Sequence, residues 1–336
     1  MTSSNATDKA MRFHRYESAD LTMIQDTAFW AIHARDDEGQ KTSWILHGNL
    51  QRDRFELSCD VWVPDAIQAI VGDVNGYVWG ITANNLLVTN APMHGQSGWS
   101  AMAVHPGLHG APVWHARELV FARAGGAAGE VAVCLLWDAG DLLIGTFSRR
   151  VYCWDGEVAR LEYDGGAPDF AGGINDLVAT RSGVFALGYG GTLVRRGDNR
   201  NWLALDTPWS RDDAAYVNVV AGVQDPSGEL RVVVDGGWVL AADHATARVT
   251  QRVSAKPLGI ALFQEDLYVG TMAGCYQLMG AGYAAPVKRG VAIGKLIGAG
   301  HTLLAIDAAP DDPDRAALRV WIRTRTTDRW LTRSVG

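Results

Sequence analysis

The stretch INDLVATRSGVFALGYGGTLVRRGDNRNWLAL, residues 174–205, decides the fold. It contains four short apolar runs, NDLVAT, VFALG, TLVRR and WLAL, which are separated by RSG, YGG and GDNRN. Each break supplies a glycine, which accepts the positive φ that tight turns require. The stretch therefore predicts one antiparallel meander of four strands.

The second run of this meander recurs along the chain. Seven segments match it, with starts 48, 65, 42, 47, 36 and 36 residues apart: FWAIH (29–33), YVWGI (77–81), LLIGT (142–146), VFALG (184–188), RVVVD (231–235), LYVGT (267–271) and LLAID (303–307). Such spacing is typical of propeller blades, because a unit this small buries both faces only against its neighbours. We predict an all-β chain, a β-propeller of seven four-stranded blades.

Two observations keep six or eight blades as alternatives. ELVFA (118–122) is a spare strand-like piece, and RFHRY (12–16) is a candidate to close the ring beside RWLTRS (329–334). We expect residues 1–10 to form a flexible N-terminus and residues 11–336 to form a single propeller domain.

One segment resembles a known repeat. VFALGYGGTLVRRGDNRNW (184–202) is similar to the short repeat of BNR-like propellers, the group that includes the photosystem II stability factor, and 142–157 and 267–278 match it in part. The resemblance implies a propeller fold. It implies no particular function, because sialidase-like, assembly-factor and binding proteins share the repeat. The strict Asp-box turn, S-x-D-x-G-x-T-W, is absent.

The composition excludes several classes of protein. The chain of 336 residues has a net charge of −7, which argues against a nucleic-acid partner. It has no run of 18 apolar residues and no apolar signal segment, so we expect a cytoplasmic protein without a membrane partner. The four widely spaced cysteines are expected to be reduced and buried, and most of the thirteen tryptophans to pack between blades.

Candidate metal ligands are few, and we expect no metal and no cofactor. His105 and His109 have a helical ligand spacing, but the intervening Pro-Gly disrupts a helix. A channel calcium site like that of propeller lactonases would have only Asn175, Asp176 and Asn218 as side-chain oxygen donors on the expected inner strands. Motifs of nucleophilic hydrolases, zinc proteases and nucleotide-binding proteins are absent, so we predict that the chain is not an enzyme.

Five long connections are expected to emerge at one end of the propeller: 35–41, 60–66, 164–173, 206–215 and 309–315. Together they contain 13 acidic and four basic residues, together with three aromatic residues. Aromatic side chains among carboxylates are typical of protein-binding surfaces. The candidate partner-binding residues are Asp36, Asp37, Trp62, Asp65, Phe170, Trp209, Asp212, Asp213, Asp311 and Asp312.

The sequence thus predicts a non-enzymatic protein-binding propeller with a basic protein partner. One concrete form is an immunity protein that neutralises a basic bacterial toxin. Two alternatives stay open, a metal-dependent propeller hydrolase or lactonase and an assembly-factor scaffold. The oligomeric state is left undetermined.

Overall fold

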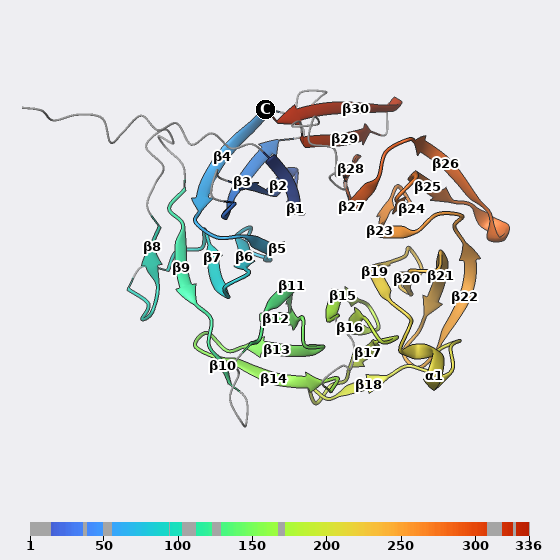
Figure 1. Ribbon diagram of the computed structural model, residues 1–336, viewed down its shortest axis with the longest axis horizontal. Coiled ribbons are helices and arrows are strands. Elements are labelled where there is room, and N and C mark those ends of the chain that lie inside the picture. Colours follow the sequence, from blue (N-terminus) through green and yellow to red (C-terminus); the bar gives the residue numbers. More distant parts are fainter. Residues whose placement is uncertain are drawn as a thin grey trace, which may run out of the picture.

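Seven antiparallel sheets form a closed ring around a central channel (Figure 1). The structure is a computed structural model that describes residues 15–35, 39–49, 56–93, 95–102, 112–122, 129–166, 172–307, 318–324 and 327–335. The predicted all-β propeller of seven blades is confirmed, and each of the seven matching segments is the second strand of its sheet. The expected flexible segment 1–10 lies outside the described residues.

The first three blades contain the following strands. Blade 1 has β1 (Arg15–Ile24), β2 (Thr27–Arg35), β3 (Lys41–Asn49) and β4 (Glu56–Val63). Blade 2 has β5 (Ile67–Gly72), β6 (Val78–Thr82), β7 (Leu86–Thr89) and β9 (His115–Glu118), with β8 (Ser100–Ala101) paired to β9. Blade 3 has β11 (Ala132–Asp138), β12 (Asp141–Thr146), β13 (Arg150–Trp154) and β14 (Ala159–Asp164).

The other four blades have four strands each. Blade 4 has β15 (Ile174–Thr180), β16 (Gly183–Gly188), β17 (Leu193–Arg196) and β18 (Trp202–Ala204). Blade 5 has β19 (Val219–Gln224), β20 (Leu230–Val234), β21 (Trp238–Ala242) and β22 (Ala247–Arg252). Blade 6 has β23 (Pro257–Phe263), β24 (Asp266–Thr271), β25 (Gly274–Leu278) and β26 (Ala284–Arg289), and blade 7 has β27 (Ile293–Ala299), β28 (Thr302–Asp307), β29 (Leu318–Thr324) and β30 (Thr327–Val335).

The spare segment ELVFA does not form an eighth blade. Only Phe121–Ala122 is a strand, β10, and it pairs in parallel with β14 at the outer edge of blade 3. Phe121 is buried and its ring lies 4.7 Å from that of Tyr152. The segment thus covers an edge of an existing blade.

Within the described residues the two end blades share no strand; of RFHRY only Arg15 and Tyr16 are described, at the start of β1, and the rest of that candidate closing segment lies outside them. β1 is the inner strand of blade 1 and pairs with β2, whereas β30 pairs with β29 in blade 7. Side-chain packing joins the two end blades, because Leu304 and Ile306 of β28 share a buried cluster with Trp30 of β2. Closure therefore depends on contacts between the end blades.

A β-bulge recurs at the same place in all seven inner strands. In each case one unpaired residue interrupts the pairing with the second strand. Bulges re-aim the side chains that follow them. The residue that follows the bulge defines an equivalent channel position in each blade, occupied in order by Asp20, Ala69, Cys134, Asp176, Ala221, Gly259 and Lys295.

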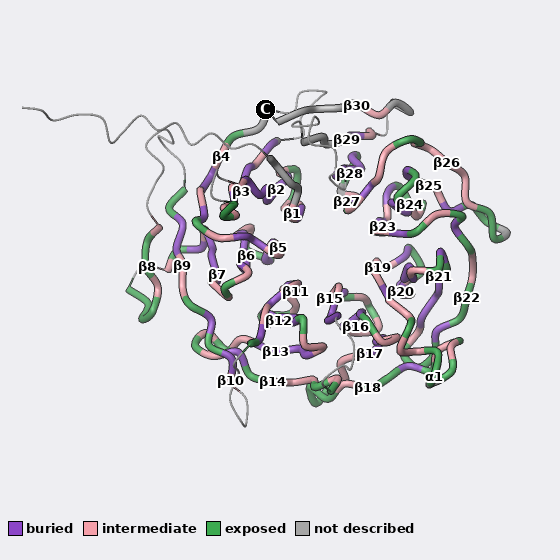
Figure 2. The backbone as a smooth tube through the Cα atoms, in the orientation of Figure 1, coloured by how far each residue is buried: buried purple, intermediate pink, exposed green. Residues whose placement is uncertain are grey.

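The core lies between neighbouring blades. Buried residues concentrate in the second and third strands of the blades, whereas the outer strands and connections contain most of the exposed ones (Figure 2). The four cysteines are free, with Cys59 half-buried and the others buried. The helices are the short α1 (Arg211–Ala214) and a 3-10 turn, Gly280–Gly282. Across the described ranges, no helix has the length and apolar character needed to cross a membrane.

Candidate functional site

Two kinds of connection emerge at one end of the ring, from second to third strands and from fourth strands to the next blade. We call this end the loop face and the opposite end the hairpin face. The strand order places the described parts of four acidic connections on the loop face, those of 35–41, 60–66, 164–173 and 206–215, whereas 309–315 lies outside the described residues. The backbone there is regular in blades 2 to 6, because the residue after the second strand donates its N–H to a carbonyl just before the first strand of the same blade. The donors are Ala83, Phe147, Tyr189, Asp235 and Met272.

Exposed apolar side chains gather on the loop face of blades 3 to 6. Phe147, Tyr189 and Met272 directly follow a second strand and are 52%, 40% and 57% exposed. Trp238 begins the third strand of blade 5 and is 37% exposed, and Tyr216, which precedes β19, is 83% exposed. These residues were not predicted from the sequence, because they lie outside the five long connections from which the candidates were taken. A search for apolar residues directly after each predicted second strand would have identified three of them.

Trp62 does not lie in a connection, as the sequence analysis assumed. It lies within β4, which continues to Val63, and it pairs with Trp44 of β3. The Trp62 side chain is half-buried, and its indole nitrogen is buried. The reason is that the apolar run extends the strand up to Pro64. Trp62 therefore belongs to the outer part of blade 1.

Trp209 does lie in a loop-face connection, and it packs against the core shared by blades 4 and 5. Its indole nitrogen would lie 2.5 Å from a Cβ at Gly191, whose φ of +61° also favours glycine. Trp209 thus fixes the connection against the hairpin of blade 4.

The predicted acidic residues fall into three groups. Asp65 bonds within the fold, since its carboxylate accepts N–H groups from Ala66 and Asn84. Asp212 and Asp213 are exposed on α1, and Asp213 also accepts the hydroxyl of the N-cap Ser210 at 2.6 Å. The remaining candidates, Asp36, Asp37, Phe170, Asp311 and Asp312, lie outside the described residues.

Some acidic residues of the five connections are internal. Asp60 is buried in β4 and bonded to His47 Nδ1 at 2.6 Å. Burial raises the pKa of Asp60, and the nearby His47 opposes that rise. Asp164 accepts a hydrogen bond from Arg150. The loop face is consequently less acidic than the count of residues in its connections indicates.

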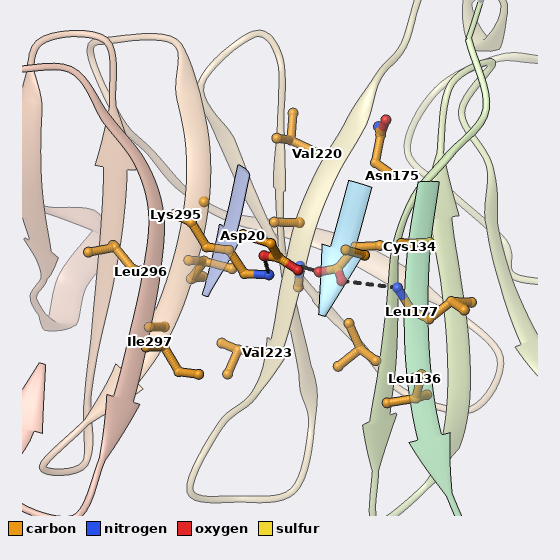
Figure 3. Close-up of a pocket in the computed structure, with 18 of the residues that line it drawn as sticks. Asp20, Cys134, Leu136, Asn175, Leu177, Val220, Val223, Lys295, Leu296 and Ile297 are labelled. Carbon is orange, nitrogen blue, oxygen red and sulfur yellow. Dashed lines mark hydrogen bonds and ion pairs between the residues drawn. The ribbon is translucent and has the colours of Figure 1, made fainter. Parts of the chain in front are cut away.

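The central channel holds the second group of chemically active residues. Its cavity has a volume of about 680 Å³ and is lined by the inner strands of all seven blades. Asp20, Asp176 and Lys295 are the charged residues among its described lining. Figure 3 shows Lys295 and Asp20 reaching toward each other, where they form an ion pair between β27 and β1.

Asp20 and Asp176 make the same backbone contacts in different blades. Each carboxylate accepts the N–H of the following residue, from Leu21 and Leu177 respectively. Each also accepts an N–H from the next blade, from Ile70 at 2.8 Å and from Gly222 at 3.0 Å. The two aspartates thus link blade 1 to blade 2 and blade 4 to blade 5.

The channel also changes how these groups ionise. Burial raises the pKa of Asp176 to about 6, while Lys295 and the Gly222 N–H oppose the rise. For Lys295, burial lowers the pKa, but the Asp20 carboxylate more than offsets this, so the pKa is raised. Asp176 was predicted from the sequence as a candidate channel residue. Asp20 was not, because no inner strand was predicted for blade 1, and Lys295 was not, because only side chains with oxygen atoms were considered as metal ligands.

Metal ligands are not assembled in the described part of the chain, where no three His, Cys, Asp or Glu side chains form a group that could hold an ion. Asn175 donates to Asn218 Oδ1 at 2.5 Å, so two of the three candidate calcium ligands bond to each other. Of the sequence-predicted zinc candidates, His105 and His109 lie outside the described residues.

Comparison with known proteins gives matches at the level of the fold. No protein-family model matches the chain, and no curated protein matches its sequence. A puromycin-hydrolysing peptidase of Mycobacterium tuberculosis is similar in structure, with 12% identity, a TM-score of 0.63, and coverage of 97% of this chain and 53% of the peptidase. The chain therefore spans about half the length of that enzyme.

Two further solved structures are similar. The WD40 β-propeller domain of Doa1 has 12% identity and a TM-score of 0.60, and the match covers 96% of this chain and all of that domain. YCF48 bound to a D1 peptide has 12% identity and a TM-score of 0.49, with 93% and 91% covered. The propeller fold that the resemblance to BNR-like proteins implied is confirmed, and identities this low do not extend the similarity to function.

Proposed function

We propose that this protein is a non-enzymatic scaffold that binds a protein partner through its loop face. The observation that carries the proposal is the gathering of Phe147, Tyr189, Tyr216, Trp238 and Met272 on the loop face of four consecutive blades. Aromatic residues and methionine are enriched in protein interfaces, and soluble proteins rarely expose large apolar patches without a use for them. The repeated backbone bonds hold three of these residues in a preformed array.

We further propose that the partner is basic. Asp212 and Asp213 are exposed on α1, only a few residues from the highly exposed Tyr216. Acidic groups at the rim of an apolar patch speed association with a basic surface. An immunity protein against a basic bacterial toxin is one form of this proposal, supported by charge alone, and an assembly-factor scaffold is another.

A hydrolase remains the second candidate, and one observation favours it. The Asp176 carboxyl lies in the channel with a pKa of about 6, in the range that suits a general base. In the described residues, however, Asp176 has two backbone N–H partners and no grouped metal ligands beside it. The loop face therefore supports partner binding better than the channel supports hydrolysis.

The experiment compares two matched surface variants. The loop-face variant combines Phe147→Ser, Tyr216→Ser and Trp238→Ser, and the control combines Val74→Ser, Met279→Ser and Tyr283→Ser on exposed hairpin-face residues. A partner is isolated by affinity capture, purified, and titrated against each variant by calorimetry. We expect the loop-face variant to bind at least about 100-fold more weakly, because interface aromatics often contribute ~2 kcal/mol or more each.

Charge is tested separately with Asp212→Lys. This change should slow association and reduce its dependence on salt, with a smaller effect on dissociation. A partner that binds the loop-face variant as tightly as the wild type, or that loses affinity only for the hairpin-face control, would overturn the proposed function. Equal association rates at low salt for Asp212→Lys and the wild type would overturn the basic partner.

A further inference from the structure

The aspartates at the equivalent channel position differ in one partner. An ionised carboxylate offers about four acceptor positions, of which two are taken by backbone N–H groups in both blades. Asp20 uses a further one for the ammonium group of Lys295. Within the described residues Asp176 accepts no hydrogen bond from a cationic side chain, although the Lys295 charge opposes the rise of its pKa.

The residue in the preceding blade explains this difference. Lys295 precedes Asp20 around the ring, since blade 7 is next to blade 1, and both occupy the equivalent channel position. The residue that stands in the same relation to Asp176 is Cys134 of blade 3. Its short side chain contacts the Ile174 carbonyl at 3.8 Å. Cys134 and Asp176 both line the channel cavity, and the Cys134 side chain is too short and carries no cation to pair with Asp176 as Lys295 pairs with Asp20.

The surrounding cavity is suited to a cation on an apolar chain. The Asp20 and Lys295 charges neutralise each other, so Asp176 leaves the channel with one net negative charge among its described lining. Apolar side chains, Leu136, Val220, Val223 and Leu258 among them, line the cavity together with polar backbone and amide groups. Alkyl stems of cationic side chains pack on such walls while the charged end binds a carboxylate.

We propose that the central channel binds an alkylammonium group, a primary amine on an apolar chain, with Asp176 as its counter-ion. Lys295 on Asp20 is the internal example of this contact. The ligand has two sources with the same chemistry, a free alkylamine or a lysine side chain of another polypeptide. This site is separate from the loop face and does not rest on the proposed function.

The first test uses the wild-type protein and n-butylammonium, with n-butanol as the uncharged control. The carboxyl carbon signals of aspartate are followed by NMR during a pH titration. We expect saturating n-butylammonium to lower the titration midpoint of Asp176 by about one unit, because an opposite charge favours the ionised form. Butanol should leave the midpoint unchanged. An unchanged midpoint with both compounds overturns the proposal.

The second test fills the site from within. Cys134→Lys places an ammonium group next to Asp176 in the same way that Lys295 lies next to Asp20. Cys134→Met introduces a long side chain at the same position without a charge. Cys134→Lys should lower the Asp176 midpoint and abolish n-butylammonium binding, whereas Cys134→Met should not lower the midpoint. Asp176→Asn should weaken binding by about tenfold or more, because hydrogen bonds to charged groups contribute ~1.5–3 kcal/mol.

The two sources are distinguished by probe. Cadaverine represents a free amine, and Nα-acetyl-lysine methylamide represents a lysine side chain, with the glutamine analogue as its neutral control. Binding of cadaverine alone assigns the site to small amines, and binding of the lysine probe assigns it to a polypeptide side chain. Equal affinity for the wild type and Asp176→Asn overturns the proposal. If Cys134→Lys does not fold, the wild-type titration still decides it.

Discussion

Two neighbouring blade boundaries contain opposite chemistry at the same position of the third strand. Trp154 ends β13 in blade 3 and Arg196 ends β17 in blade 4, and the strand pairing makes the two residues equivalent. Trp154 packs against Trp79 of blade 2 at 5.7 Å between ring centroids. Arg196 instead forms ion pairs with Asp141 and Glu162 of blade 3.

The difference shows that the propeller requires contact between blades but does not specify its chemistry. At the first boundary four indoles pack together, with Trp79 also stacked on Trp137 at 5.0 Å and edge-on to Trp99. At the second, Arg200 and the Trp202 indole N–H add to the group around Glu162. Aromatic packing depends on area and shape, whereas the ionic group requires every buried charge to keep its partner.

The largest effect is expected at the aromatic boundary. Trp79→Ala should lower the free energy of unfolding by about 3–5 kcal/mol, because it leaves a cavity and removes the hydrogen bond from its indole N–H to Asp73. Denaturant unfolding measures the loss. Trp202→Ala, at a half-buried outer strand, is the control and should cost less. Equal losses of unfolding free energy for the two variants would contradict the prediction that Trp79 contributes most to this boundary.

A somewhat smaller loss is expected at the ionic boundary. Arg196→Ala should lower the free energy of unfolding by about 3 kcal/mol, because it leaves the buried Glu162 carboxylate without its main cation. The double variant Arg196→Met with Glu162→Met should recover most of that loss, since apolar residues can replace a buried ion pair. If the double variant is less stable than Arg196→Ala, the carboxylate is not the source of the loss.

A third kind of bridge, between blades 4 and 5, responds to pH. The pKa of Asp176 is about 6 in the folded state, above the ordinary value, so the folded protein holds this proton where the unfolded chain has lost it. Stability contributed by Asp176 is therefore lost as the pH rises from about 4 to about 6. Relative to Asp176→Asn, the wild type should be most stable near pH 4 and lose that advantage by pH 7. A constant difference across this range would contradict the raised pKa.

The smallest effect is expected from Arg200→Ala. The Arg200 side chain is 60% exposed, and exposed ion pairs contribute only about 0–1 kcal/mol. Unfolding at low and high salt should show a loss of at most that size, which salt reduces further. A loss as large as that of Arg196→Ala would show that Arg200 is the main partner of the carboxylates.

Sequence alone determined the strands, because the signals for strands and turns are local. The seven matching segments are the second strands of seven blades, and the run NDLVAT lies in the inner strand β15. Apolar runs and glycine turns depend on neighbours within a few residues, so they can be read without the fold. The strand order then also assigned the described long connections to the loop face.

Only the tertiary structure decided which side chains meet. Asp20 and Lys295 are 275 residues apart in the sequence, and the residues around each of them do not indicate that the two side chains form an ion pair. The tertiary structure also turned Asp60 and Asp65 inward and put Phe147 and Tyr216 at the surface. Pairing and exposure depend on how blades pack, and the periodicity that predicts a blade is the same whether a tryptophan or an arginine faces its neighbour.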